Sequence, residues 1–256
     1  MSTGSPSDAL AWATVTTWVV PKRGHTIAEC EDAIAWRSRG ERLHVAVADG
    51  ATESAYAQAW AQHLTQAMVS KATGKRKAEG ETSEFERRVL DARARLRQEL
   101  DARASEAPWY VAQKTEQGAH AAVLALQVAR GGTYSADAVG DVVLFHLRED
   151  RLLTSWPLTE ADAFTTRPDL VSSLEGVPVS GKTHPGAWKP GDVFLIATDA
   201  LAAWLLAHPE AQMRAAREHD AGAALIDEAH ASGMTNDDAA LVRVVLGGDV
   251  LAEGSP

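Results

Sequence analysis

The sequence predicts an α+β fold in which antiparallel β-sheets are covered by helices. Strand-like and helix-like segments come in runs and lack the regular β-α-β alternation of a doubly wound sheet. Hydrophobic residues make up 45% of the 256 residues, which is enough for a large core, and no Pro/Ser-rich linker divides the chain. We therefore expect one domain over residues 1–256, with flexible tails at residues 1–9 and 250–256.

Strands are predicted where β-branched, aromatic and other apolar residues run together between turn residues. The first such run reads WATVTTWVV, and Gly131-Gly132 supplies a hairpin turn further along the chain. The expected strands are residues 12–20, 32–37, 42–48, 120–130, 133–139, 142–148, 151–156, 192–198 and 239–246.

Helices are predicted where apolar residues recur every three or four positions. One such face is formed by Tyr56, Trp60, Leu64 and Met68. Ser83 and Glu86 have the spacing of a capping box and begin a second long helix, whose buried face ends at Leu100. Three further helices are expected at residues 201–207, 210–218 and 221–232.

Two segments are expected to be irregular. Residues 21–30 are polar and contain a glycine, so they are interpreted as a loop. Residues 158–190 hold four prolines and are predicted to form a long loop with at most one short helix.

Composition narrows the classes of partner and compartment. The formal net charge of −10 argues against a nucleic-acid or membrane partner, because phosphate binding requires basic patches. Cys30 is the only cysteine, which excludes an intramolecular disulfide and a thiolate metal site. The sequence shows neither a signal-peptide pattern nor an apolar run of about 18 residues, so we expect a cytoplasmic protein.

Acidic residues border the apolar runs at five places along the chain. They are Glu31-Asp32, Asp49, Asp141, Asp199 and Asp237-Asp238. Each acid alone is explained by turn chemistry, since Asp bonds readily to the local backbone. If the sheets bring these strand ends together, however, the carboxylates would repel one another and require cations. Oxygen ligands without a matching Cys or His cluster suit magnesium or manganese.

Several segments resemble the metal-dependent protein phosphatases of type 2C, in the order of that family and over nearly the whole chain. In particular, the sequence is similar to a bacterial, single-domain branch of the family. The matching segments are ECEDA (29–33), VAVADGATES (45–54), GAHAAVLAL (118–126) with SADAVGDVVLFHLREDRL (135–152), KPGDVFLIATDAL (189–201) and TNDDAALVRVV (235–245).

The resemblance implies a four-layer α-β-β-α sandwich, in which two antiparallel sheets are flanked by helices and two Mn²⁺ or Mg²⁺ ions bind at one edge. It implies a serine/threonine phosphatase that hydrolyses phosphoserine or phosphothreonine with a water activated between the two cations. The implied ligands are Asp32, Asp49, the Gly50 carbonyl, Asp199 and Asp237, with Asp141 in a weaker third site, while Glu31 and Asp238 form the outer shell.

Three positions depart from the family pattern. Ile27 stands where many members carry an arginine that grips the substrate phosphate, so Lys22, Arg23 and His25 are the candidates for that role. Ala51 replaces a histidine found in animal members, and Ala203 replaces an acid that would support the third metal. An alternative function is therefore a weak or inactive phosphatase-like module that regulates phosphoproteins by binding them.

The resemblance also implies a partner. Bacterial relatives often oppose a serine/threonine kinase, so we expect a phosphorylated protein substrate that belongs to such a kinase system. Residues 158–190 correspond to the variable flap of the family, which is where the choice of substrate is expected to lie.

Overall fold

The computed structural model describes residues 12–51, 56–71, 83–104, 117–165 and 167–247, and the predicted tails lie outside these ranges. All described strand pairs are antiparallel and form two sheets. In order across the first sheet, the strands are β1 (Ala13–Val20), β11 (Ala239–Leu246), β10 (Val193–Ala197), β6 (Val143–Arg148) and β7 (Arg151–Trp156). The second sheet runs β2 (Ala33–Arg39), β3 (Arg42–Gly50), β4 (His120–Ala129), β5 (Thr133–Val139) and β9 (Lys182–Ala187), with the short β8 (Val171–Ser172) also paired to β4.

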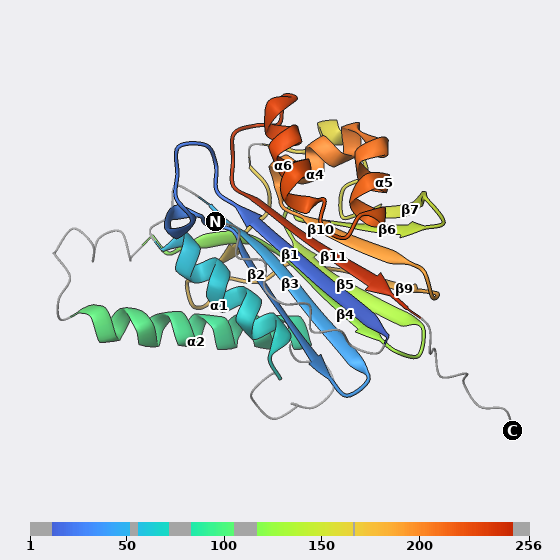
Figure 1. The fold of residues 1–256 in the computed structure, drawn as a ribbon. Helices are drawn as coiled ribbons and strands as arrows, with labels where there is room; N and C mark the ends of the chain where they lie inside the picture. Colours follow the sequence, from blue (N-terminus) through green and yellow to red (C-terminus); the bar gives the residue numbers. More distant parts are fainter. Residues whose placement is uncertain (1–11, 52–55, 72–82, 105–116, 166, 248–256) are drawn as a thin grey trace, which may run out of the picture.

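Helices cover the outer face of each sheet, which completes the expected four layers (Figure 1). The second sheet is covered by α1 (Ala57–Val69), which packs on β2, β3 and β4, and by α2 (Glu84–Ala104), which packs on α1. The first sheet is covered by α4 (Asp199–Ala207), α5 (Pro209–Arg217) and α6 (Gly222–Ala231). Two 3₁₀ turns complete the described elements, η1 (Ile27–Glu29) and η2 (Ala161–Ala163).

Alternating side chains on the central strands separate the layers. In β3, Leu43, Val45 and Val47 point into the core between the sheets, whereas Ala46 and Ala48 belong to the core beneath α1. This strand is therefore buried on both faces, and its small outward residues let α1 approach closely. The predicted capping box of α2 is also confirmed, since Ser83 Oγ accepts a hydrogen bond from Glu86 N–H while Glu86 Oε2 accepts one from Ser83 N–H.

The prediction for residues 158–190 was partly wrong, because this segment contributes strands β8 and β9. The strand signal of β9 was hidden by Pro185 and Gly186. Pro185 fits because β9 is the last strand along the edge of the second sheet, where a missing N–H is tolerated. A Cβ on Gly186 would lie only 2.3 Å from the ring of Tyr134, so the glycine lets the edge strand lie over that ring.

The strand directions place all the predicted site acids at one end of the sandwich. Strand β2 begins just after Asp32, while β3 reaches that same end at Asp49. In the first sheet, β6 begins after Asp141, β10 ends before Asp199, and β11 begins after Asp238. The antiparallel pairing therefore gathers acids that are far apart in the sequence.

Gly50 lies at the tightest point of this end. A Cβ on Gly50 would lie 2.8 Å from the Ala57 carbonyl oxygen and 3.0 Å from the Glu31 carbonyl oxygen. Both contacts are with backbone, so the chain would have to shift to accept any side chain. Because Gly50 has no side chain, the end of β3 can approach the start of α1 this closely.

We predict that Gly50→Ala lowers the free energy of unfolding by about 1–3 kcal/mol, because the new methyl group overpacks a backbone contact. Gly131→Ala is the matched control, since a Cβ there meets nothing within 4 Å. Chemical denaturation of both variants measures the difference. Equal stability of the two variants would contradict the close packing at Gly50.

Candidate metal centre

Five aspartates line one hollow of about 540 Å³ at this end of the sandwich. They are Asp49, Asp141, Asp199, Asp237 and Asp238, and Gly50 lies on the same wall. The structure thus brings together all the predicted metal ligands except Asp32, which is not among the lining residues. Within the described ranges, no group of three or more His, Cys, Asp or Glu side chains is already arranged to coordinate a metal ion. The acids therefore share a hollow without a closed ligand shell.

Asp32 lies buried at the start of β2, and only 6% of its surface is exposed. Its Oδ2 accepts a hydrogen bond of 2.8 Å from Thr198 Oγ1, which in turn accepts one from Ala240 N–H. Its Oδ1 is buried and has no hydrogen-bond partner. Burial raises the pKa of Asp32, and the negative charges of Asp238 and Asp199 raise it further.

The pKa values of Asp49, Asp199 and Asp141 are shifted in the same direction. Burial raises the pKa of Asp49, and Asp32, Asp199 and Asp141 add to the effect. Burial also raises the pKa of Asp199, with a contribution from Asp237. Burial and the charge of Asp199 raise the pKa of Asp141 to about 6. Each carboxylate therefore makes ionisation of its neighbours less favourable.

Asp238 connects the loop of residues 22–31 to the site through two hydrogen bonds. Its Oδ1 accepts a hydrogen bond from the backbone N–H of Lys22, and its Oδ2 accepts one from that of Glu31, both at 2.8 Å. These two bonds fix both ends of the 22–31 loop. Asp237 is more accessible, with 43% of its side chain exposed.

The residues predicted to bind the substrate phosphate lie on the 22–31 loop. The Lys22 ammonium is 3.9 Å from Glu31 Oε2 and 3.9 Å from Asp237 Oδ1, and only 14% of its side chain is exposed. Arg23 is exposed, while its backbone N–H donates to Asn236 Oδ1. His25 is exposed as well, and Ile27 is 58% exposed on η1. Lys22 alone of these four is paired with the site acids.

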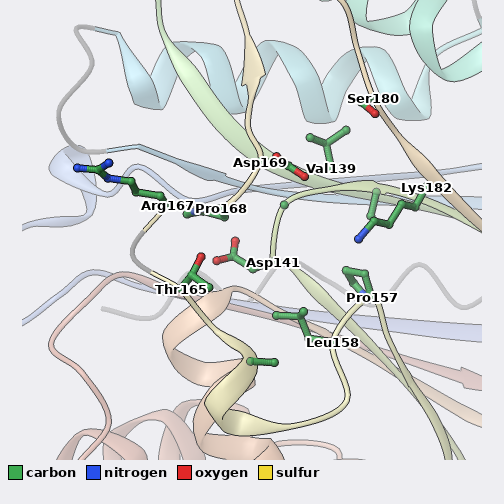
Figure 2. A pocket seen from close by; sticks show the side chains of 13 residues that line it. Val139, Asp141, Pro157, Leu158, Thr165, Arg167, Pro168, Asp169, Ser180 and Lys182 are labelled. Atoms are coloured by element: carbon green, nitrogen blue, oxygen red, sulfur yellow. The ribbon is translucent and has the colours of Figure 1, made fainter.

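Arg167 is a candidate residue that the sequence interpretation missed. It lines the acidic hollow together with Thr165, Pro168 and the aspartates. It also lines a neighbouring hollow of about 230 Å³, where Figure 2 shows it at one end, Lys182 at the other and Asp141 between them. A single arginine inside a Pro-rich loop has no sequence pattern that separates it from an ordinary surface arginine.

The residues present fit divalent cations. The donors are carboxylate oxygens, which suit Mg²⁺ or Mn²⁺. Buried carboxylates that raise one another's pKa are stabilised by a positive charge among them, and the unpartnered Oδ1 of Asp32 is an orphaned acceptor at this position. Cys30 offers no alternative nucleophile, because burial and the nearby Asp32 and Asp238 raise its pKa to about 12.

Comparison with known proteins identifies the family. The chain belongs to the protein phosphatase 2C family, whose model matches residues 22–222, well over half of the 256-residue chain. Comparison with curated proteins gave no match.

Solved structures of the same fold cover nearly all of the chain. A serine/threonine phosphatase of S. agalactiae is similar at 16% identity with a TM-score of 0.63, over 92% of this chain and all of that one. The catalytic domain of the phosphatase PstP, solved with two manganese ions, has 16% identity and a TM-score of 0.60, over 92% and 100% of the two chains. RsbX in complex with magnesium has 16% identity and a TM-score of 0.51, over 96% and 100%. These likenesses establish the fold as that of the phosphatase family.

None of the helices in the described ranges has both the length and the apolar character needed to cross a membrane.

The raised pKa of Asp141 predicts how stability depends on pH. The folded carboxyl has a pKa of about 6 against an ordinary value of 3.8, so between these values the folded state binds more protons than the unfolded state. Stability should therefore fall as the pH rises through this window. In chelator, we predict a greater loss between about pH 4 and about pH 6 for the wild type than for Asp141→Asn.

Thermal denaturation at several pH values checks this difference. Asp101→Asn removes an exposed carboxylate on α2 and serves as the matched control, with the pH dependence of the wild type. Parallel curves for the wild type and Asp141→Asn would show that Asp141 is an ordinary turn acid.

Proposed function

We propose that this protein is a metal-dependent protein-serine/threonine phosphatase. The observation that carries the proposal is the convergence of five aspartates from both sheets on one hollow, with Asp32 buried at the same end. The family membership of the chain supports the same chemistry. The substrate would be a phosphoserine or phosphothreonine side chain on a protein.

The residues proposed to hold two divalent cations are Asp49 and the Gly50 carbonyl, with Asp32, Asp199 and Asp237 around them. Asp141 is proposed for a weaker third site shared with Asp199. When bound, the two cations would lower the pKa of the attacking water and neutralise charge on the phosphoryl oxygens.

The protein's own contribution is to hold its carboxylates in place. Asp49 ends a strand that is buried on both faces, so its position is rigid. Asp32 is oriented by Thr198, which connects it to β11. Because the pKa values of these acids are raised, cation binding would release protons from them. Affinity for the cations should therefore increase with pH.

A second candidate function is a weak or inactive module that binds phosphoproteins as a regulator. Ile27 favours this alternative, because it removes the positive charge that many family members use to hold phosphate. The retained acids favour the enzyme. A binding module would still take up cations and phosphoprotein but would release no phosphate.

The setting proposed for the enzyme follows from its family. We propose a cytoplasmic phosphatase that reverses the action of a bacterial serine/threonine kinase on a shared protein substrate. Residues 158–190 contain β8 and β9 and line part of the hollow beside the acids. They would contact the substrate around its phosphorylated residue.

We predict hydrolysis of a small aryl phosphate that requires Mn²⁺ or Mg²⁺ and stops in chelator. Asp49→Asn and Asp199→Asn should each lower kcat by at least about 100-fold, because each removes a charged ligand. Asp101→Asn should retain the wild-type rate. If the folded wild type binds cations and phosphoprotein yet releases no phosphate, the regulatory module is the better account.

We also predict that Mn²⁺ raises the melting temperature of the wild type, since a cation bound only by the folded state stabilises it. The shift should be lost in Asp49→Asn, whose metal-free melting temperature should itself be higher than that of the wild type because one repulsive charge is gone. Differential scanning calorimetry in chelator and in Mn²⁺ measures both effects. An unchanged Mn²⁺ shift in Asp49→Asn would remove this residue from the metal centre.

A further inference from the structure

A phosphate ester carries negative charge into a hollow that five aspartates already make negative. Two divalent cations would offset part of this charge, and the family pattern adds an arginine at the position of Ile27. Building on the proposed function, we propose that Arg167 binds the substrate phosphate in this protein. The role would thus have moved from the 22–31 loop to the flap, residues 158–190.

The loop residues are poorly placed for this task. The Lys22 ammonium already lies 3.9 Å from both Glu31 and Asp237, so its charge is shared with two carboxylates. Arg23 and His25 are exposed and are not among the residues that line the acidic hollow. The Ile27 side chain is apolar and mostly in solvent. The 22–31 loop therefore presents no unshared positive charge to the hollow.

Arg167 is the one basic residue among the described residues that line the acidic hollow. Within the described parts of the chain, no carboxylate forms an ion pair with its guanidinium. The side chain is exposed and so remains free to rotate towards an incoming anion. In Figure 2 it extends from the chain beside Pro168 with its guanidinium pointing away from Asp141, so binding an anion in the hollow requires the side chain to rotate.

The backbone that carries Arg167 is anchored next to the metal centre. Three residues further on, at Leu170, the chain lines the same hollow and then enters β8, where Val171 pairs with Ala121 of β4. The Asp169 carbonyl oxygen packs over Gly140, where a Cβ would lie 2.9 Å from it. Gly140 also has a φ of +96°, which glycine adopts without strain. The Gly140-Asp141 corner therefore supports the segment that presents Arg167.

The chemistry of arginine suits the task. Its guanidinium presents paired N–H donors that match two phosphate oxygens, and it stays charged at any pH at which the enzyme would work. Lysine offers a point charge without this paired geometry. Arg167→Lys should therefore retain only part of the function of the wild-type residue.

The test compares Arg167→Gln and Arg167→Lys with the wild type in Mn²⁺. For Arg167→Gln we expect the KM for an aryl phosphate and the Ki for inorganic phosphate each to rise by about 10- to 100-fold, as expected for loss of a charged hydrogen bond. Arg167→Lys should give smaller increases. The Mn²⁺-induced shift in melting temperature should stay at the wild-type value, because Arg167 does not bind the cations.

Arg151→Gln, which removes an exposed arginine at the start of β7, is the matched control with wild-type KM and Ki. Calorimetric titration of the Mn²⁺-loaded protein with inorganic phosphate gives a readout that does not need turnover. Active wild type with an unchanged phosphate Ki in Arg167→Gln would overturn the inference and leave the proposed function standing. A greater loss in Arg23→Gln than in Arg167→Gln, or no phosphate binding by the wild type, would also overturn it.

Discussion

The repulsion between carboxylates gathered at one end of the sandwich is the interaction on which the proposed function depends. Burial alone disfavours the ionised forms of Asp32 and Asp49, and the neighbouring acids add to that cost. A fold that maximised its own stability would not collect six aspartates in this way. In the proposed function, divalent cations bound among them would make the arrangement favourable, so the stability given up in the metal-free state would be linked to the metal chemistry.

The rest of the fold makes this arrangement possible. Strand β3 carries Asp49 from a core that is packed on both faces, and Gly50 lets the backbones of β3 and α1 meet without a side chain between them. Asp238 binds both ends of the 22–31 loop, which places this loop beside the site. The segment around Arg167 closes over another side and is supported by Gly140. The hollow is thus lined by strand ends and by the segment that carries Arg167.

Much of this could be predicted from the sequence, because the strong local signals agree with the tertiary structure. Strands 133–139, 151–156 and 239–246 were predicted with the bounds that the structure shows, and the Ser83–Glu86 capping box forms as its spacing indicated. The aspartates were found because each one borders an apolar run. Their convergence depended on strand pairing, which came from the resemblance to a family.

Other features had no local signal. Strand β9 was missed because Pro185 is tolerated at a sheet edge, and the sequence does not reveal which strand is the edge. Arg167 was missed because its significance lies in lining the same hollow as acids that are distant in the sequence. The role of Asp238 as a backbone acceptor for Lys22 and Glu31 also depends on tertiary structure, since more than 200 residues separate it from both.

The most direct test of the central claim is a crystal structure of the protein grown with Mn²⁺, with anomalous scattering measured at the manganese edge. We expect anomalous peaks among the aspartates of the hollow, beside Asp49, Asp199 and Asp237. Crystals that diffract well and show no anomalous signal between Asp49, Asp199 and Asp237 would contradict it.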